Sequence, residues 1–350
     1  LLASESNAQV SAAHLLYVRD GTLFAQPFDP DSLELKGEPA SIADRVWFAT
    51  DKFGHSSFSV SRAGDVVFRN GTPESQLTWI DRTGKVLGAV GPPGLWDEPA
   101  ISRNGARLSA ERGEMEMENN FVFEIDAAHG NFSRVSPGDW ESVDSAWSPD
   151  GTKVAFRSNK DGERKVWIRD MATGREEVAF RSSGLPGPID WTPDGRYLLC
   201  GTSIGGFTLW LVPVSGDRTP RQLRARATRQ IQFSPDGRFI IYAAAEEGSS
   251  EVYLRRFPLT EERWQVSRGG GTEPRWRADG SEIFYVDGGR RLNAVLVRTA
   301  TSIEIGKPVP LFATGTRFVP DRRASYAVAP DGQRFLFVVP LDQARPTLTF

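Results

Sequence analysis

The segment closest to a catalytic motif is Gly201-Thr202-Ser203-Ile204-Gly205, which has the Gly-x-Ser-x-Gly spacing of a hydrolase nucleophile elbow. In that motif the serine lies on a tight turn between a strand and a helix, beside an oxyanion hole. Here the residues from Phe207 to Leu211 favour a strand where the helix should begin. We therefore expect no catalytic serine at this motif.

Other residues able to do chemistry are few and scattered. The histidines His14, His55 and His129 lack the spacing of metal ligands, and Cys200 lies in an apolar run typical of a buried, inert thiol. The acidic segment Glu114–Asn120 offers oxygen ligands for calcium but lacks the spacing of a calcium loop, which favours a solvated loop. The sequence predicts no catalytic residue, no metal site and no cofactor.

Aromatic and charged residues between predicted repeats are the better candidates for binding. Trp96-Asp97 and Trp140-Glu141 precede the first strands of two repeats, and loops at such positions build a face suited to ligands. A basic stretch could bind an anionic ligand, but without interleaved aromatic residues it is a weak signal for nucleic acid; its members are Arg218, Arg221, Arg224, Arg226 and Arg229. The predicted binding residues are Trp96, Asp97, Trp140, Glu141, Arg229 and Glu273.

The composition narrows the classes of partner. The 350 residues include 42 basic and 45 acidic side chains, and the formal net charge of −3 gives no global attraction to nucleic acid or to an anionic membrane. No apolar run approaches the ~20 residues of a membrane span. Because the chain starts at Leu1 without an initiator methionine, we expect it to be an excerpt of a longer polypeptide.

The elements that must position these residues are set by an internal repeat. Its clearest copies are Trp147–Gly151, Trp191–Gly195, Phe233–Gly237, Trp276–Gly280 and Val328–Gly332, and Val60–Gly64 and Ile101–Gly105 are degenerate copies. From Gly64 onward the glycines lie 41, 46, 44, 42, 43 and 52 residues apart, which is the length of one four-stranded propeller blade. The chemistry of Pro, Asp and Gly predicts a tight turn in each copy; the turn residues are Asp150, Gly151, Asp194, Gly195, Asp236, Gly237, Asp279, Gly280, Asp331 and Gly332.

Strand-like runs surround each turn, and no segment has a helical period. The sequence therefore predicts an all-β fold, a single β-propeller over residues 1–350 with seven or eight blades of four antiparallel strands. The expected blades are 8–45, 56–90, 98–136, 144–181, 187–224, 229–267, 272–315 and 324–350. Because a ring avoids exposed strand edges, we expect Leu1 to Ala3, or a nearby N-terminal strand, to complete the last blade.

The repeat resembles a known family. The aromatic-Ser-Pro-Asp-Gly unit, followed by a strand that ends in Asp-x-x-Thr-Gly as at Asp170–Gly174, is similar to the TolB-like, WD-related propeller repeat. Propellers of this kind have unrelated activities, so the resemblance implies the fold more than the function. The runs Leu15–Asp29 and Leu35–Pro39 resemble the propeller region behind the kinase domain and membrane span of bacterial receptor-type serine/threonine kinases. The chain itself contains none of the kinase motifs.

These features predict a non-enzymatic binding, sensor or scaffold module that recognises a protein, a peptide or an envelope polymer. The alternative is a propeller hydrolase or lyase with a carboxylate-lined central channel. We expect a monomeric domain with a protein or peptide partner, no nucleic acid and no membrane span. The resemblance implies a periplasmic or extracytoplasmic location as part of a larger bacterial protein.

Overall fold

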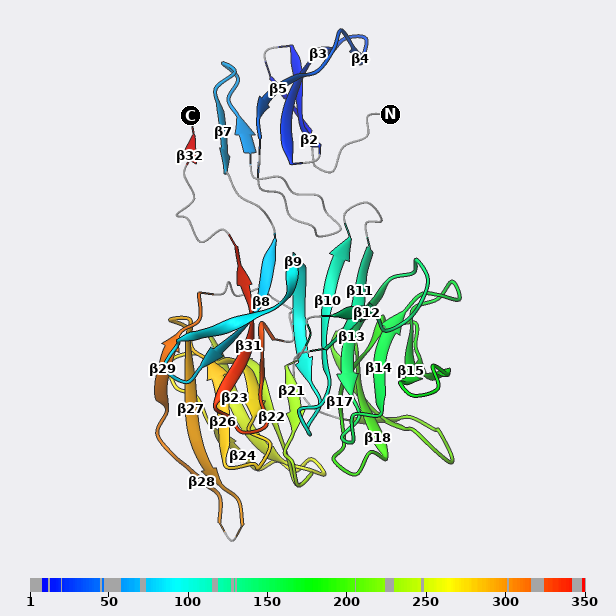
Figure 1. Ribbon diagram of the computed structural model, residues 1–350, viewed down its shortest axis with the longest axis vertical. Coiled ribbons are helices and arrows are strands. Elements are labelled where there is room, and N and C mark those ends of the chain that lie inside the picture. Colours follow the sequence, from blue (N-terminus) through cyan, green and yellow to red (C-terminus); the bar gives the residue numbers. More distant parts are fainter. Residues whose placement is uncertain are drawn as a thin grey trace. The chain divides into compact units, whose positions relative to one another are not determined.

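The computed structural model describes residues 8–11, 13–19, 21–44, 46, 58–69, 74–114, 119–126, 129, 131–204, 206–223, 230–246, 249–300, 302–315, 324–341 and 348–349. These residues form antiparallel strands, turns and loops (Figure 1), which confirms the predicted all-β class. None of them belongs to a helix of the length and apolarity that a bilayer crossing requires. The chain divides into two compact units, Leu1–Ser75 with Met115–Glu118 and Pro340–Phe350 (unit 1) and Gln76–Glu114 with Asn119–Val339 (unit 2).

Unit 1 contains two small sheets. One is built from β1 (Gln9–Ser11), β2 (His14–Arg19), β3 (Thr22–Asp29), β4 (Glu34–Leu35) and β5 (Ala40–Ala43), and the other from β6 (Phe58–Val60), β7 (Val66–Arg69) and β32 (Leu348–Thr349). Its own apolar core consists of Leu16, Val18, Leu23, Val46 and Phe58.

Unit 2 contains the turn repeats. Its first strands are β8 (Ser75–Asp81), β9 (Val86–Ile101), β10 (Leu108–Glu114), β11 (Asn119–Ile125), β12 (Phe132–Arg134), β13 (Ser142–Trp147), β14 (Lys153–Ser158), β15 (Lys165–Asp170) and β16 (Glu176–Arg181). Next come β17 (Pro186–Trp191), β18 (Tyr197–Thr202), β19 (Thr208–Pro213), β20 (Arg221–Leu223), β21 (Ile231–Phe233), β22 (Phe239–Glu246), β23 (Ser249–Arg256) and β24 (Arg263–Gln265). The last are β25 (Thr272–Trp276), β26 (Glu282–Val286), β27 (Arg291–Arg298), β28 (Glu304–Ile305), β29 (Val309–Ala313), β30 (Tyr326–Val328) and β31 (Arg334–Pro340).

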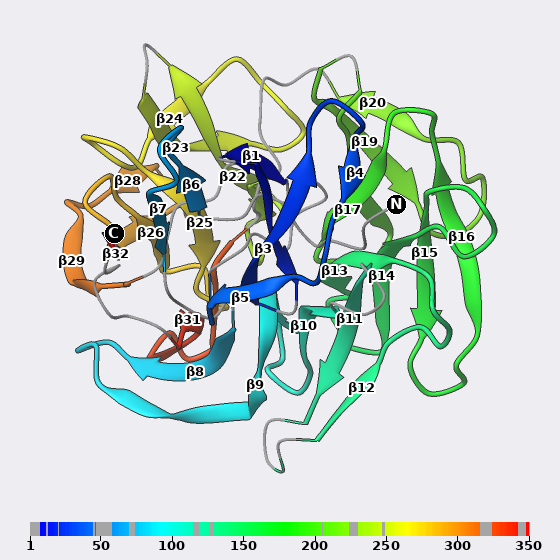
Figure 2. The same ribbon diagram turned by 90° about the horizontal axis from the view of Figure 1, so that it is seen from above.

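These strands form six blades around a common centre (Figure 2). Blade 1 is the second half of β9 with β10, β11 and β12; blades 2, 3 and 4 are β13–β16, β17–β20 and β21–β24; and blade 5 is β25–β29. Blade 6 combines β30 and β31 with β8 and the start of β9. The long strand β9 therefore serves two blades, and the chain's C-terminal strands complete a blade begun more than 200 residues earlier.

Contacts between the turns show that the six blades close a ring. In each turn a Cβ placed on the glycine would meet the turn of the preceding blade, 3.3 Å from Pro193 at Gly237 and 2.8 Å from Pro330 at Gly105. The full cycle of contacts is Gly151 with Asn104, Gly195 with Pro149, Gly237 with Pro193, Gly280 with Pro235, Gly332 with Arg277 and Gly105 with Pro330. Because the last contact returns from blade 1 to blade 6, the cycle has six members.

The core of unit 2 lies between neighbouring blades. In β22, Phe239 and Ile241 belong to an apolar cluster shared with blade 5, whereas the alternate residues Ile240 and Tyr242 belong to one shared with blade 3. Successive side chains of a strand point to opposite faces, and both faces of a blade are covered. This explains why second strands such as β22 and β26 are apolar at most positions, and why Trp191 is buried between blades 2 and 3.

The blades predicted from the sequence differ from the observed blades of unit 2 in number and in boundaries. The count of seven or eight blades is not confirmed, since unit 2 has six and the predicted segment 56–90 is divided between the sheets of β6–β7 and β8–β9. Leu1–Ala3, expected to close the last blade, lie outside the described residues, and the strand beside β31 is β8. A single propeller over residues 1–350 stays a prediction.

Candidate functional site

The six inner strands of unit 2 begin at one common end. They are the second half of β9, β13, β17, β21, β25 and β30, and each leads into a glycine turn of the contact cycle. Because the turns gather at one end, the starts of the inner strands must gather at the other, which we call the start end. The predicted binding residues Asp97, Glu141 and Glu273 lie at or near strand starts on this end.

The two candidate tryptophans have different environments. Trp96 is only 3% exposed; its ring packs edge-on against Phe123 and Phe132, and its Nε1 donates to the Pro92 carbonyl at 2.8 Å. Trp140 is 46% exposed and is held by a 3.2 Å hydrogen bond from its Nε1 to the Pro137 carbonyl. Only Trp140 therefore offers an accessible ring, and Trp96 is a core residue.

The other candidates are mostly engaged within the fold. Glu141 is 7% exposed and its Oε2 lies 3.2 Å from Nε of Arg164. Asp97 is half-buried, and its Oδ1 accepts a hydrogen bond from the Glu98 backbone N–H at 2.7 Å. Glu273 is 3% exposed, whereas Arg229 lies outside the described residues.

Buried carboxylates join neighbouring blades by accepting backbone N–H groups from the next blade. The N–H of Asp144 donates to Glu111 at 2.6 Å, that of Phe233 donates to Asp190 at 2.8 Å, and that of Ser325 donates to Glu273 at 2.6 Å. Bulges interrupt the pairing of the inner strands in blades 1, 2, 3 and 5, and a bulge frees backbone groups from the ladder. Since a buried N–H must find an acceptor, these side chains act as ties between blades.

One group of carboxylates at the start end resembles a cation site. The oxygens of Glu98, Glu111 and Asp144 lie within 4.8 Å of one another. Asp144 already faces the Arg157 guanidinium, with Nη1 3.2 Å from Oδ2, and its own N–H bonds to Glu111. Burial raises the pKa of Glu111 well above its usual range, and the charges of Glu98 and Asp144 raise it further. Burial and the neighbouring charges therefore favour the protonated form of Glu111.

Sequence reasoning missed this group because Glu98, Glu111 and Asp144 belong to three different strands, β9, β10 and β13. Glu111 and Asp144 are 33 residues apart and stand in unlike local contexts. The only available signal was that both fall in predicted strands of adjacent repeats.

The axis of unit 2 is a narrow cavity. Each inner strand contributes to its lining, for example through Pro99, Ser145, Asp190, Gln232, Arg275 and Val328. The Asp190 carboxylate lies 3.7 Å from the Arg103 guanidinium, and burial raises the pKa of Asp190 while Arg103 opposes that effect. The cavity volume is about 90 Å³, well below the roughly 300 Å³ at which small-molecule sites begin. Water or a small ion fits there, but an oligomeric substrate does not.

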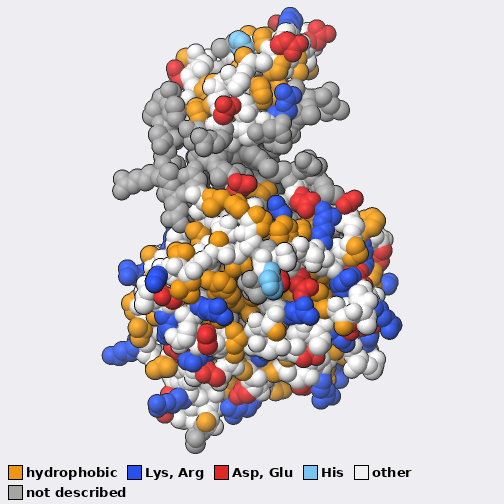
Figure 3. Space-filling model, viewed as in Figure 1, with side chains coloured by type: hydrophobic (Ala, Val, Ile, Leu, Met, Phe, Trp, Pro, Cys, Tyr) orange, Lys and Arg blue, Asp and Glu red, His pale blue; other side chains and the backbone are white. Residues whose placement is uncertain are grey.

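Two other sequence interpretations are settled locally. Ser203 follows β18 and precedes the strand β19, so the nucleophile-elbow geometry is not formed. Cys200 is fully buried, and burial raises its pKa well above the usual thiol range, as expected of an inert thiol. On the face of unit 2 seen in Figure 3, basic and acidic side chains are interspersed and form no single basic area.

Comparisons with known proteins agree with the family that the repeat resembles. The family model described as the TolB beta propeller domain matches residues 126–342. The Tol-Pal system protein TolB of Alcanivorax borkumensis is 41% identical over 61 residues, which is 17% of this chain and 14% of that protein. An uncharacterised protein of Agrobacterium fabrum is 23% identical over 207 residues, 54% of this chain and 69% of that protein. The TolB match thus spans only a small part of that relative.

A solved structure has the same fold. The putative TolB of Agrobacterium tumefaciens superposes with a TM-score of 0.57 and 16% identity, over 77% of this chain and 98% of that one. At this identity the likeness concerns the fold alone.

Proposed function

Because this chain belongs to the TolB β-propeller domain family, we propose that it is a non-enzymatic binding or scaffolding module. The partner is a protein, a peptide or an envelope polymer, which contacts the loops at the start end of unit 2. The kinase-associated sensor role suggested by the N-terminal resemblance is part of this proposal and applies to the parent protein.

One observation carries the proposal. The buried acids Glu111, Asp190 and Glu273 each accept a backbone N–H from the next blade. A catalytic acid or base needs a free approach to a substrate proton, and these groups are engaged in holding the ring together. The exposed loop that carries Trp140 remains available for contact, because an amphipathic aromatic ring is a frequent anchor at interfaces.

The enzymatic alternative is favoured by one feature of the axis. Burial raises the pKa of Asp190, and the charges of Arg103 and Arg275 oppose that effect, so charged groups from three blades converge at a carboxyl group with a perturbed pKa. Perturbed groups of this kind are frequent at active sites. The small cavity and the Phe233 hydrogen bond argue against a lyase or hydrolase site.

A capture experiment tests the binding role. The purified chain is immobilised and exposed to an envelope extract, in parallel with Trp140→Ala and Leu296→Ala; Leu296 is 66% exposed on β27 and serves as the matched control. We expect a partner retained by the wild type and by Leu296→Ala but lost from Trp140→Ala. Equal retention by all three chains would place the contact elsewhere.

The enzymatic alternative has its own test. The chain is incubated with peptide and acidic glycan substrates, and turnover is followed for the wild type and for Asp190→Asn. We expect no turnover. Activity that Asp190→Asn abolishes would replace the binding proposal with the alternative.

We propose an extracytoplasmic location on the same family grounds. The test is the reading frame upstream of Leu1, which should encode either a kinase domain followed by an apolar span of about 20 residues or a secretory signal. A frame that encodes neither contradicts this location.

A further inference from the structure

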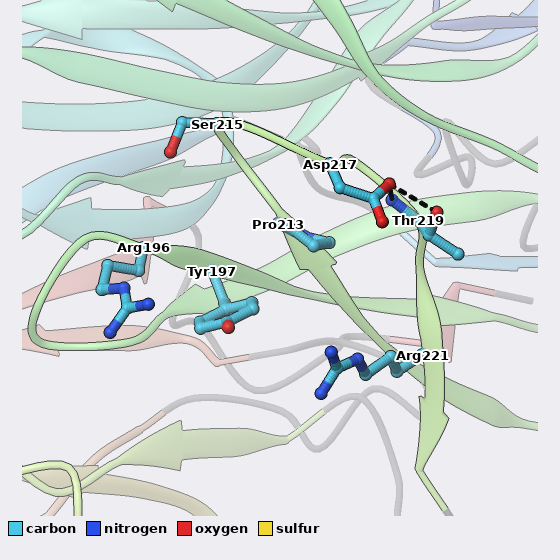
Figure 4. Close-up of a pocket in the computed structure, with 7 residues that line it drawn as sticks. All are labelled: Arg196, Tyr197, Pro213, Ser215, Asp217, Thr219 and Arg221. Carbon is cyan, nitrogen blue, oxygen red and sulfur yellow. Dashed lines mark hydrogen bonds between the residues drawn. The ribbon is translucent and has the colours of Figure 1, made fainter.

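The basic stretch found in the sequence contributes to a pocket that the proposed binding face does not use. Of its five arginines, Arg218 and Arg221 are described, and Arg218 is paired with Glu177 through two 3.1 Å contacts. Arg221 instead lines a surface pocket of about 270 Å³ on blade 3 (Figure 4). The pocket is lined by Arg196, Tyr197, Pro213, Ser215, Asp217, Thr219 and Arg221 and shares no residue with the axial cavity.

Strand register brings the lining residues together. Tyr197 at the start of β18 lies opposite Pro213 at the end of β19, and Arg221 at the start of β20 lies opposite Leu211. Opposite residues and residues two apart share one face of a sheet, so Tyr197, Pro213 and Arg221 do so here. Arg196 follows directly on the Asp194-Gly195 turn, and Figure 4 shows Arg196 and Arg221 on either side of Tyr197.

Arg196 differs from its counterpart in the next blade, and, within the described part of the chain, Arg221 has a free guanidinium group like that of Arg196. In blade 4, Arg238 stands at the position of Arg196, and its Nε donates to Asp236 of its own turn at 2.7 Å. Among the described residues, the guanidinium groups of Arg196 and Arg221 have neither a hydrogen bond nor an ion pair. The Cζ of Arg196 lies over the Tyr197 ring, 5.8 Å from its centroid.

The acid of the pocket is already committed to its own turn. Oδ1 of Asp217 accepts hydrogen bonds from the Thr219 N–H and hydroxyl at 3.1 and 2.6 Å. The Thr219 hydrogen bonds and the charge of Arg221 lower the pKa of Asp217, so the carboxylate stays ionised near neutral pH. Two guanidinium groups and one carboxylate leave the pocket with a net positive charge.

We propose that this pocket binds a small saccharide unit that carries an oxyanion, either a sugar carboxylate or a sugar phosphate. Guanidinium forks match the geometry of both oxyanions. The half-buried Tyr197 ring and Pro213 offer apolar surface to the C–H face of a sugar ring, and Asp217 and Ser215 can bond its hydroxyl groups. The pocket volume lies near the lower limit for small-molecule sites, which suits a single sugar unit.

Titration calorimetry on the full chain tests the site. The probes are glucuronate, glucose 6-phosphate, glucose and inorganic phosphate, and we expect binding of one or both charged sugars with a dissociation constant of roughly a millimole per litre or below. Binding of only one charged sugar identifies the oxyanion. We expect Arg196→Gln and Arg221→Gln each to weaken binding by about two- to fivefold, as the loss of an ion pair at an exposed site predicts.

The matched controls separate a built site from a positive surface. Arg218→Gln removes a neighbouring arginine that is paired outside the pocket, and it should leave binding unchanged. Tyr197→Leu should weaken the binding of the charged sugars. It should leave any binding of inorganic phosphate unchanged, because both arginines remain. The proposal is overturned if no charged sugar binds, if glucose binds equally well, if inorganic phosphate matches the charged sugars, or if Arg218→Gln has the effect of Arg221→Gln.

Discussion

At the scale of single residues, the buried carboxyl group of Glu111 makes the stability of the fold depend on pH. In blade 1, this carboxyl group accepts a hydrogen bond from the backbone N–H of Asp144 in blade 2. Burial raises its pKa well above 4.5, the usual value for glutamate. Above pH 4.5, Glu111 therefore keeps its proton in the folded chain but releases it in the unfolded chain. By linkage, this group's contribution to stability is greatest below pH 4.5 and falls as the pH rises toward the folded-state pKa.

Replacing this carboxyl group gives the first prediction. Glu111→Gln keeps an acceptor for the Asp144 N–H without the titration, so its free energy of unfolding relative to wild type should increase as the pH rises from 4.5 to 8. Denaturant melts at several pH values measure this difference. If the free energies of unfolding of the two chains changed in parallel with pH, the raised pKa of Glu111 would be contradicted.

The control for this prediction is Glu111→Leu. It leaves the buried Asp144 N–H without its acceptor, so we expect a loss of about 1–3 kcal/mol near pH 4.5. Because leucine does not titrate either, this loss should become smaller as the pH rises.

The glycine of a turn gives the second prediction. Gly237 has φ = +73°, and a Cβ there would meet Pro193 at 3.3 Å. Gly237→Val should destabilise unit 2 by about 1–3 kcal/mol more than Gly237→Asn, because asparagine tolerates the left-handed region and a β-branched residue does not. Thermal unfolding of both variants checks this, and equal losses would show that contact with Pro193, rather than backbone strain, dominates.

At the scale of elements, the closure of the ring depends on strands from both ends of unit 2. β31 pairs with β8, and Arg82, directly after β8, donates from both terminal nitrogens to Glu282 of blade 5 at 2.9 Å. Phe337 of β31 is fully buried and packs against Tyr326 and Phe312. Blade 6 therefore ties distant parts of the chain into one fold.

The third prediction concerns this closing strand. Phe337→Ala should lower the stability of unit 2 by about 3–5 kcal/mol, because a large buried ring is replaced by a cavity. Chemical denaturation measures the loss. Leu296→Ala, at a site 66% exposed, should change stability by less than about 0.5 kcal/mol, and comparable losses for both would contradict the closing role of β31.

At the scale of the whole molecule, the two units have separate apolar cores. Leu23 is fully buried in the core of unit 1 with Leu16 and Phe58, whereas the cores of unit 2 lie between its blades. Units with their own cores can unfold separately. The fourth prediction is that calorimetry detects two transitions and that Leu23→Ala lowers only one of them, while Phe337→Ala lowers the other.

A single transition shifted by both variants would contradict this division into two units. Light scattering of the same samples checks the predicted monomer, which at 38.6 kDa is easily distinguished from a dimer.

The sequence by itself determined the features that arise from neighbouring residues. The Pro-Asp-Gly turns, the all-β class, the repeat length and the inert Cys200 follow from local chemistry. The five predicted turn glycines all have a positive φ in the structure.

Only the tertiary structure decided what depends on residues far apart in the chain. It separated the buried Trp96 from the exposed Trp140, although both were expected in loops before first strands, because Trp96 lies within β9 and is covered by Phe123 and Phe132. It joined β8 to β31, and it brought Arg221 to the pocket that Arg196 and Tyr197 also line. A turn is fixed by the torsional preferences of a few consecutive residues, whereas burial and pockets are fixed by contacts that exist only once the blades have packed.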